Sequence, residues 1–108
     1  SRVKQDFAEA FNLMKICTEY DYPKAWAELA NMYLTGKGTD IDLNEAYRHL
    51  LKGISHNDPY AYYLKGLMHK DKRLSIFNLE EATACFETAY GLGYKPAKEQ
   101  LERLSQLK

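Results

Sequence analysis

The segment TGKGTDIDLNEA, residues 35–46, has residue types that could bind a phosphate group or a calcium ion. A phosphate-binding P-loop needs a glycine, four further residues, and then Gly-Lys followed by Ser or Thr, so that backbone N–H groups surround the phosphates. Here Gly36 and Lys37 are followed by Gly38, and Asn31 stands where the first glycine is required. The spacing therefore argues against a nucleotide site.

The same segment begins like a calcium-binding loop, because Asp40, Asp42 and Asn44 occupy alternate positions. Such a loop also needs glycine at its sixth place and a carboxylate at its twelfth. Those places hold Glu45 and Leu51. The segment is therefore better interpreted as a connection between two helices, in which Asp42 is the N-cap and Glu45 completes a capping box.

This pair of residues belongs to a repeat of 36 residues. Equivalent cap pairs are Asp6 with Glu9, Asp42 with Glu45, and Asn78 with Glu81. Apolar and small residues keep the same period: Ala10, Ala46 and Ala82; Met14, Leu50 and Phe86; Cys17, Gly53 and Ala89; Ala25, Ala61 and Ala97. Two helical patterns per period, with small residues at fixed places where helices approach each other, are typical of a helical-hairpin solenoid.

The positions of these signals predict an all-α chain, since no segment alternates apolar and polar residues as a strand does. The expected helices span residues 3–19, 23–35, 43–55, 59–71, 79–91 and 95–107. We expect a single domain over residues 1–108, made of a second helix of a truncated repeat (3–19), two repeats (22–57 and 58–93) and a C-terminal capping helix (94–108). Terminal repeats need a polar outer face, and the expectation includes further repeats upstream of residue 1.

The unit resembles the Sel-one-like repeat, a relative of the tetratricopeptide repeat. The residues that carry the resemblance are Ala25, Leu29, Ala30, Tyr33, Gly36, Gly38, Asp42, Ala46 and Gly53. The second repeat departs from the pattern at Lys65, at His69 and in the segment KDKRL. The resemblance implies a right-handed superhelix of antiparallel helix pairs. It also implies a protein-binding adaptor, because members of this family are not usually enzymes.

Cysteine and histidine residues offer little chemistry in this pattern. Cys17 and Cys85 do not share a repeat position, and we expect both to be buried free thiols. His49 is expected at a helix interface and His56 in a turn, and no two histidines have the spacing of a metal site on one helix. No serine lies in a nucleophile-elbow context. The sequence therefore predicts no catalytic residue, no metal ligand and no cofactor.

Charge and hydropathy exclude two classes of partner. Fifteen basic and fifteen acidic residues give a formal net charge of zero, so nothing draws the whole chain to nucleic acid or to an anionic membrane. No run of about twenty apolar residues is present, and membrane insertion is not expected. What remains is a surface for another protein or a peptide.

In such a solenoid the first helix of each pair lines the concave face. The residues predicted to be exposed there and to bind a partner are Lys24, Ala27, Asn31, Tyr60, Tyr63, Leu67, Lys70, Glu99 and Arg103. The leading hypothesis is a non-catalytic adaptor that binds a peptide or a partner protein on this face. The alternatives are a bacterial immunity or inhibitor protein that blocks a toxin enzyme, and a cell-wall hydrolase. Self-association through the N-terminal helix is a further prediction.

Overall fold

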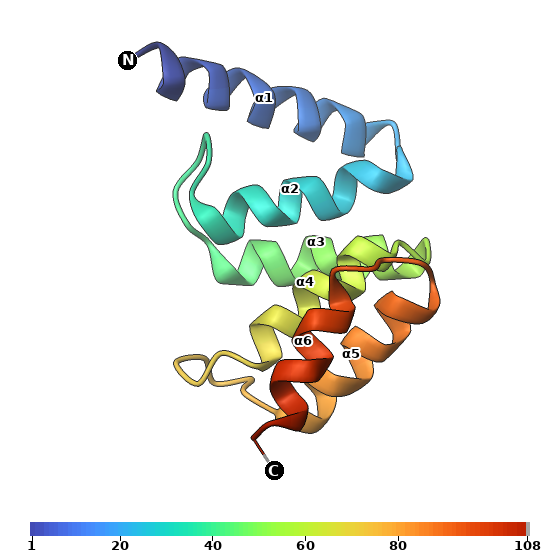
Figure 1. Ribbon diagram of the computed structural model, residues 1–108. Coiled ribbons are helices and arrows are strands. Elements are labelled where there is room, and N and C mark those ends of the chain that lie inside the picture. The colour runs from blue at the N-terminus through green and yellow to red at the C-terminus, as the bar shows by residue number, and fades with distance from the viewer. Residues whose placement is uncertain (108) are drawn as a thin grey trace. The chain divides into compact units, whose positions relative to one another are not determined.

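The computed structural model describes residues 1–107, and this part of the chain contains six α-helices and no β-strand (Figure 1). The helices are α1 (Arg2–Glu19), α2 (Pro23–Thr35), α3 (Leu43–Ser55), α4 (Pro59–His69), α5 (Leu79–Gly91) and α6 (Ala97–Ser105). The prediction of an all-α fold is confirmed, and α2, α3 and α5 begin and end where the sequence predicts. The chain divides into two compact units. Ser1–His56 holds α1 to α3, and the unit that begins at Asn57 holds α4 to α6.

Side-chain caps determine where the second helix of each pair begins. The side chain of Asp42 accepts a hydrogen bond from the backbone N–H of Glu45 at 3.0 Å, and Asn78 does the same for Glu81 at 3.1 Å. Such caps satisfy one of the four N–H groups that a helix leaves unpaired at its start. These two predicted N-caps are confirmed.

The other half of the predicted capping box is replaced by a backbone bond. The N–H of Asp42 donates to the carbonyl of Tyr33 at 3.0 Å, and the N–H of Asn78 donates to the carbonyl of His69 at 2.7 Å. Donors and acceptors are both 36 residues apart, so the two loops are closed by equivalent bonds. Because the carbonyl of Tyr33, at the end of α2, takes the N–H of Asp42, the carboxylate of Glu45 is left to pair with Arg48 at 2.7 Å.

The cap predicted at Asp6 is wrong. Helix α1 begins at Arg2, and Ser1 is its N-cap, with Oγ accepting from the N–H of Lys4 at 3.4 Å. The residues before Asp42 and Asn78 are held in a loop by a helix-end carbonyl, whereas nothing in the described chain turns the backbone at Asp6. Residues 2–5 therefore continue the helix, as their helix propensities allow.

Helices α4 and α6 are shorter than predicted, and local turns explain the difference. After α4, the N–H of Asp71 bonds to the Met68 carbonyl at 3.2 Å, a tighter i→i+3 turn. Before α6, the N–H of Ala97 bonds to the Tyr94 carbonyl at 3.2 Å in the same way. Pro96, which lacks an N–H, then serves as the N-cap of α6.

The first unit is layered from three helices, with α2 packed against both α1 and α3 (Figure 1). Ala25, Leu29, Ala46 and Leu50 are among its buried residues. His49 packs at the α2–α3 interface as predicted, with its ring 5.7 Å from that of Trp26 and 5.4 Å from that of Tyr33. His56 lies in the turn after α3, also as predicted.

The core of the second unit surrounds Phe86, which is fully buried with Ala82, Ala89 and Ala97. A Cβ atom placed on Gly66 of α4 would lie 2.6 Å from Cε1 of the Phe86 ring, so only glycine allows α4 to lie this close to α5. The predicted role of small residues at the helix seam is confirmed here.

The two cysteines differ in burial. Both are free thiols, but Cys17 is only half-buried whereas Cys85 is buried. The expectation of two buried cysteines is therefore wrong for Cys17. Burial raises the pKa of the Cys85 thiol, which keeps it in its neutral form near pH 7.

Candidate functional site

The predicted partner-binding residues of α2 differ in their exposure. Lys24 is exposed and Asn31 is half-buried. Ala27 is fully buried, so the prediction that it lies on an open face is wrong. A helical wheel gives the direction of Ala27 from α2, but it does not show that this side of the helix is covered in the fold. A partner can therefore contact Lys24 and Asn31, but not Ala27.

The predicted residues of α4 are all half-buried rather than exposed. The ring centroid of Tyr63 lies 5.6 Å from that of Phe86 and 4.9 Å from that of Tyr94. Leu67 packs against the cluster around Phe86. The prediction that Tyr60, Tyr63, Leu67 and Lys70 are exposed is therefore wrong. At Tyr63 and Leu67, α5 and the segment leading into α6 cover part of this face.

Gln100 of α6 is a residue that the sequence analysis did not select. Its side chain is buried, its Oε1 accepts a hydrogen bond from Nζ of Lys70 at 2.6 Å, and its Nε2 donates to the hydroxyl of Tyr63 at 3.3 Å. The signal was present in the sequence, since Gln100 stands one period after the buried residue Leu64. A polar residue at a buried repeat position indicates a hydrogen-bonding partner.

These contacts form a continuous row of side chains in the second unit, which we call the tyrosine band: Tyr60, Tyr94, Tyr63, Gln100 and Lys70. The rings of Tyr60 and Tyr94 are 5.6 Å apart, and Tyr94 in turn contacts Tyr63. Gln100 then links Tyr63 to Lys70. The three tyrosines and the lysine are each partly accessible to solvent. The band therefore offers aromatic surface and one ammonium group, all held by neighbouring side chains.

The predicted residues of α6 are exposed and paired with each other. Nη2 of Arg103 lies 2.6 Å from Oε1 of Glu99, and the side chains are 62% and 66% exposed. An exposed ion pair of this kind contributes little to stability. Both charges thus remain accessible to a partner.

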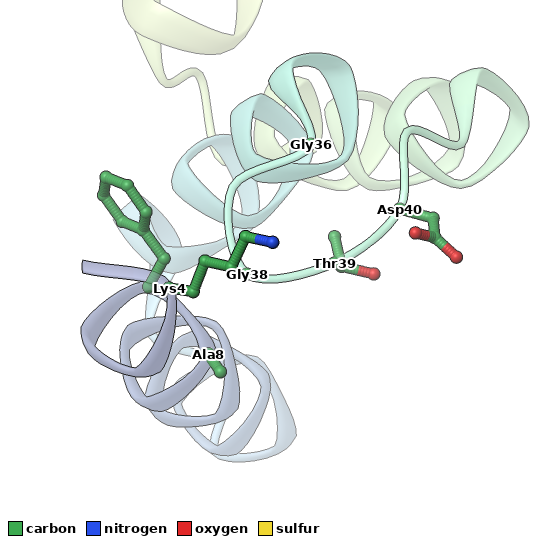
Figure 2. Close-up of a pocket in the computed structure, with 7 residues that line it drawn as sticks. Lys4, Ala8, Gly36, Gly38, Thr39 and Asp40 are labelled. Atoms are coloured by element: carbon green, nitrogen blue, oxygen red, sulfur yellow. The ribbon is translucent and has the colours of Figure 1, made fainter. Parts of the chain in front are cut away.

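The glycine-rich loop after α2 packs against the first half of α1 (Figure 2). Gly38 has a φ of 78°, and a Cβ atom on it would lie 2.1 Å from the Phe7 carbonyl oxygen. The loop and α1 together line an open cavity of about 500 Å³, formed by Lys4, Phe7, Ala8, Gly36, Gly38, Thr39 and Asp40. Figure 2 shows Lys4 extending from α1 toward the loop at Gly38. Gly38 thus allows the loop to lie close against α1.

One of the two carboxylates in this region has a structural role. Asp42 caps α3, and Asp40 is exposed. Among residues 1–107, no group of three or more His, Cys, Asp or Glu side chains lies close enough together to hold a metal ion. No helix in the same range has the length and apolar character needed to cross a membrane.

Two aspartates have lowered pKa values for identifiable reasons. Asp21, which adopts a positive φ of 55° between α1 and α2, accepts hydrogen bonds from Nε1 of Trp26 at 2.8 Å and from Nε2 of His56 at 3.1 Å. The Trp26 bond is the main cause of its lowered pKa, followed by the His56 bond. Hydrogen bonds from the side chain and backbone of Arg73 lower the pKa of Asp71 to about 2. Both carboxylates stabilise turns.

One solved structure with a similar fold is the crystal structure of a Sel1 repeat protein from Oxalobacter formigenes. The TM-score is 0.75 at 28% sequence identity, and the match covers 87% of this chain and 38% of that chain. No protein-family model matches the sequence, and no curated protein matches it. The 36-residue period, the helix pairs with equivalent caps and this likeness support assignment of the chain to the Sel1-like (Sel-one-like) repeat family.

Proposed function

We propose that this chain is a non-catalytic adaptor module that binds a partner protein through first-helix side chains of its second unit, on α4 and α6. The family resemblance supports a protein-interaction role. The observation that carries the proposal is the tyrosine band, which combines partly accessible aromatic rings with a positioned ammonium group.

The band has the physical properties of a binding hot spot. Tyrosine rings present a large contact area with few rotatable bonds, so little conformational entropy is lost when a partner packs on them. Tyr60 and Tyr63 are already held against Tyr94 at centroid distances of 5.6 and 4.9 Å. Residues of this kind, half-buried and restrained before binding, are over-represented among the side chains that dominate binding energy.

The ammonium group of Lys70 favours a partner that presents a hydrogen-bond acceptor or a negative charge at one end of the band. An ammonium group has three N–H donors, and Gln100 accepts one of them at 2.6 Å. A carboxylate, or a carbonyl at the C-terminus of a helix, would complement this charge. The accessible charges of Glu99 and Arg103 on α6 add to the polar surface of the second unit. The proposed ligand is thus a peptide or helix with an aromatic or aliphatic anchor and a neighbouring acidic group.

Partners are first recovered by affinity capture. The dissociation constant of each partner is then measured by calorimetry for three variants of this protein. Tyr60→Ala and Lys70→Glu should each weaken binding about tenfold or more, as loss of a hot-spot residue does. Tyr90→Ala is the matched control, because Tyr90 is an exposed tyrosine of the same unit that lies on the second helix α5. Binding that is unchanged in Tyr60→Ala and Lys70→Glu would remove the band from the proposal.

Helix content by circular dichroism separates lost binding from lost folding in these variants. Tyr63→Ala is unsuitable for this purpose, because Tyr63 packs against the buried Phe86 ring. Tyr63→Phe is the informative change at that position, since it removes only the hydroxyl that accepts from Gln100.

A further inference from the structure

Gln100 of α6 is a buried polar side chain whose two hydrogen bonds have a fixed direction. It is 8% exposed and lies between Lys70 and Tyr63 in the tyrosine band. An ammonium group can only donate, so the amide oxygen of Gln100 must face Lys70. The amide NH2 group then faces Tyr63 and donates to its hydroxyl oxygen at 3.3 Å. The charge on Lys70 thus determines which way this amide points.

The direction of the Gln100 amide determines what the hydroxyl of Tyr63 can offer to a ligand. A phenol hydroxyl carries one hydrogen and can also accept. Because the Tyr63 oxygen accepts from Gln100, its own hydrogen points away from that amide. Within residues 1–107, Tyr63 makes no second hydrogen bond that would use this hydrogen. Tyr63 is therefore a hydrogen-bond donor for whatever packs on the band.

The ammonium group of Lys70 has no carboxylate partner in the part of the chain that the structure describes. Its side chain bonds to a neutral amide at 2.6 Å. Asp71, the next residue, is paired instead with Nη2 of Arg73 at 2.8 Å. Glu99, on α6, is paired with Nη2 of Arg103 at 2.6 Å. Because Lys70 is half-buried and a partly desolvated charge without a counter-ion is costly, this end of the band favours a negative charge from a ligand.

The amide of Gln100 also indicates the shape of group that can reach both donors. It is planar, with an oxygen and a nitrogen on one carbon, and these two atoms contact Lys70 and Tyr63. A carboxylate has the same planar shape with an oxygen at each end. From the solvent side it can accept from the ammonium group with one oxygen and from the phenol with the other. A carboxamide would turn its NH2 group toward one of the two donors.

We propose that Lys70 and Tyr63 form a binding subsite for the carboxylate of a glutamate side chain in the partner, and that Gln100 is the positioning residue. The proposal rests on the proposed function and specifies the acidic group of the ligand. Both donors are half-buried, so the carboxylate has to reach below the surface. The methylene groups of glutamate allow this reach, and they can pack on the rings of Tyr63 and Tyr94, whose centroids are 4.9 Å apart.

The probe is capped glutamate, N-acetyl-glutamate N-methylamide, titrated into the 108-residue protein. NMR detection of the side-chain NH2 signals of Gln100 reports binding at the subsite itself. We expect a saturable shift with a Kd on the order of 1–10 mM, because the probe is small. Capped glutamine is the matched control ligand, since it has the same shape without the charge. It should bind at least about tenfold more weakly, because it lacks the charge-assisted hydrogen bond.

Two variants test the two donors separately. Tyr63→Phe should weaken binding of capped glutamate about threefold to tenfold, since it removes one neutral hydrogen-bond donor. Lys70→Gln should weaken it about tenfold or more, since it removes the charged donor. Lys72→Gln is the matched control, because Lys72 is an exposed lysine of the same segment. It should change binding by less than about twofold.

Gln100→Glu tests the positioning role while both donors are retained. The introduced carboxylate would accept from Lys70 and from the hydroxyl of Tyr63, so both donors would turn away from a ligand. Binding of capped glutamate, followed in this variant by the backbone amide signals of α6, should fall at least about tenfold. Helix content by circular dichroism should stay unchanged. Unchanged binding in a folded Gln100→Glu variant would show a merely structural role and overturn the proposal.

Four other results would overturn the proposal. They are no saturable shift of the Gln100 signals, equal binding of capped glutamate and capped glutamine, tighter binding of N-acetylalanine, and tighter binding of inorganic phosphate. N-acetylalanine carries the carboxylate of a chain terminus, and phosphate is a tetrahedral anion, so either result would assign the two donors to another ligand.

Failure of this proposal is distinguishable from failure of the proposed function. A partner that loses affinity in Tyr60→Ala, together with no binding of capped glutamate, would keep the tyrosine band as an interaction surface and remove only the carboxylate subsite. Capped glutamate that binds as expected, together with partners that Tyr60→Ala and Lys70→Glu do not affect, would support the subsite and remove the band from the proposed function.

Discussion

Gly66 lies directly on the ring of Phe86, at a distance that excludes any side chain. An added Cβ atom would come within 2.6 Å of Cε1 and 2.9 Å of Cδ1 of the ring. Phe86 is fully buried in one cluster with Ala82 and Ala89, so a shift of its ring would disturb the packed core. This contact sets how closely α4 and α5 approach each other.

Gly66→Ala should therefore destabilise the protein despite the higher helix propensity of alanine. Overpacking of a core costs about 1–3 kcal/mol, whereas a glycine-to-alanine change within a helix gains about 1 kcal/mol. We expect a net loss of up to about 2 kcal/mol, measured by urea unfolding. The matched control is Gly91→Ala in α5, where an added Cβ atom has no neighbour within 4 Å. An equal effect of the two substitutions would contradict the close contact.

Gly38→Ala should destabilise the first unit by more than its positive φ alone requires. A non-glycine residue at positive φ costs about 1–2 kcal/mol, and the clash of an added Cβ with the Phe7 carbonyl adds to it. Gly93→Ala is the control that measures the cost of the positive φ alone, because Gly93 has a φ of 103° and no atom near the position of an added Cβ. We expect Gly38→Ala to exceed Gly93→Ala by about 1 kcal/mol or more in thermal unfolding. Faster amide exchange in the first half of α1 should accompany it.

Asp42→Ala and Asn78→Ala should each destabilise the protein by about 1 kcal/mol, because each removes an N-cap hydrogen bond to the next turn of the helix. The control is Asp6→Ala, at the third equivalent position of the repeat, where the residue lies inside α1 and caps nothing. This change should stay within about 0.5 kcal/mol. A large effect at Asp6 in urea unfolding would show that a cap forms there after all.

Asp71 should titrate with a pKa of about 2, below the ordinary aspartate value of 3.8, because Arg73 donates hydrogen bonds to its carboxylate. A carboxyl group with a lowered pKa contributes stability above its unfolded pKa, and that stability is lost as the pH falls through the folded pKa. The window for Asp71 thus lies between about pH 4 and pH 2. Carbon-detected NMR titration should show the pKa rising toward 3.8 in Arg73→Gln.

Asp21 provides the internal control for this titration, since its own lowered pKa depends mainly on Trp26. Arg73→Gln should leave the pKa of Asp21 where it is, whereas Trp26→Phe should raise it. A parallel shift of both aspartates in Arg73→Gln would indicate a general electrostatic effect instead of the local hydrogen bonds.

Local chemistry made the starts of α2, α3, α4 and α5 predictable from the amino-acid sequence alone. An N-cap such as Asp42 or a proline such as Pro59 acts on backbone groups within one turn. The 36-residue period then identified the helix pairs and the family resemblance, because equivalent helices need small residues at equivalent places. Register also placed Lys24, Tyr60 and Lys70 on first-helix faces; Lys24 is exposed in the fold, whereas Tyr60 and Lys70 are half-buried.

Which of those side chains are covered was decided only by the tertiary structure. Periodicity gives the direction in which Ala27 or Tyr63 leaves its helix, but burial depends on which segments pack against that side. Gln100 and Lys70 are hydrogen-bonded although they are 30 residues apart in the sequence, and a local sequence pattern does not predict a contact at that separation. The same reason explains why Asp6 is not a cap. It has the residue type of a cap, but its backbone N–H has no bond to the end of a preceding helix of the kind that Asp42 and Asn78 make.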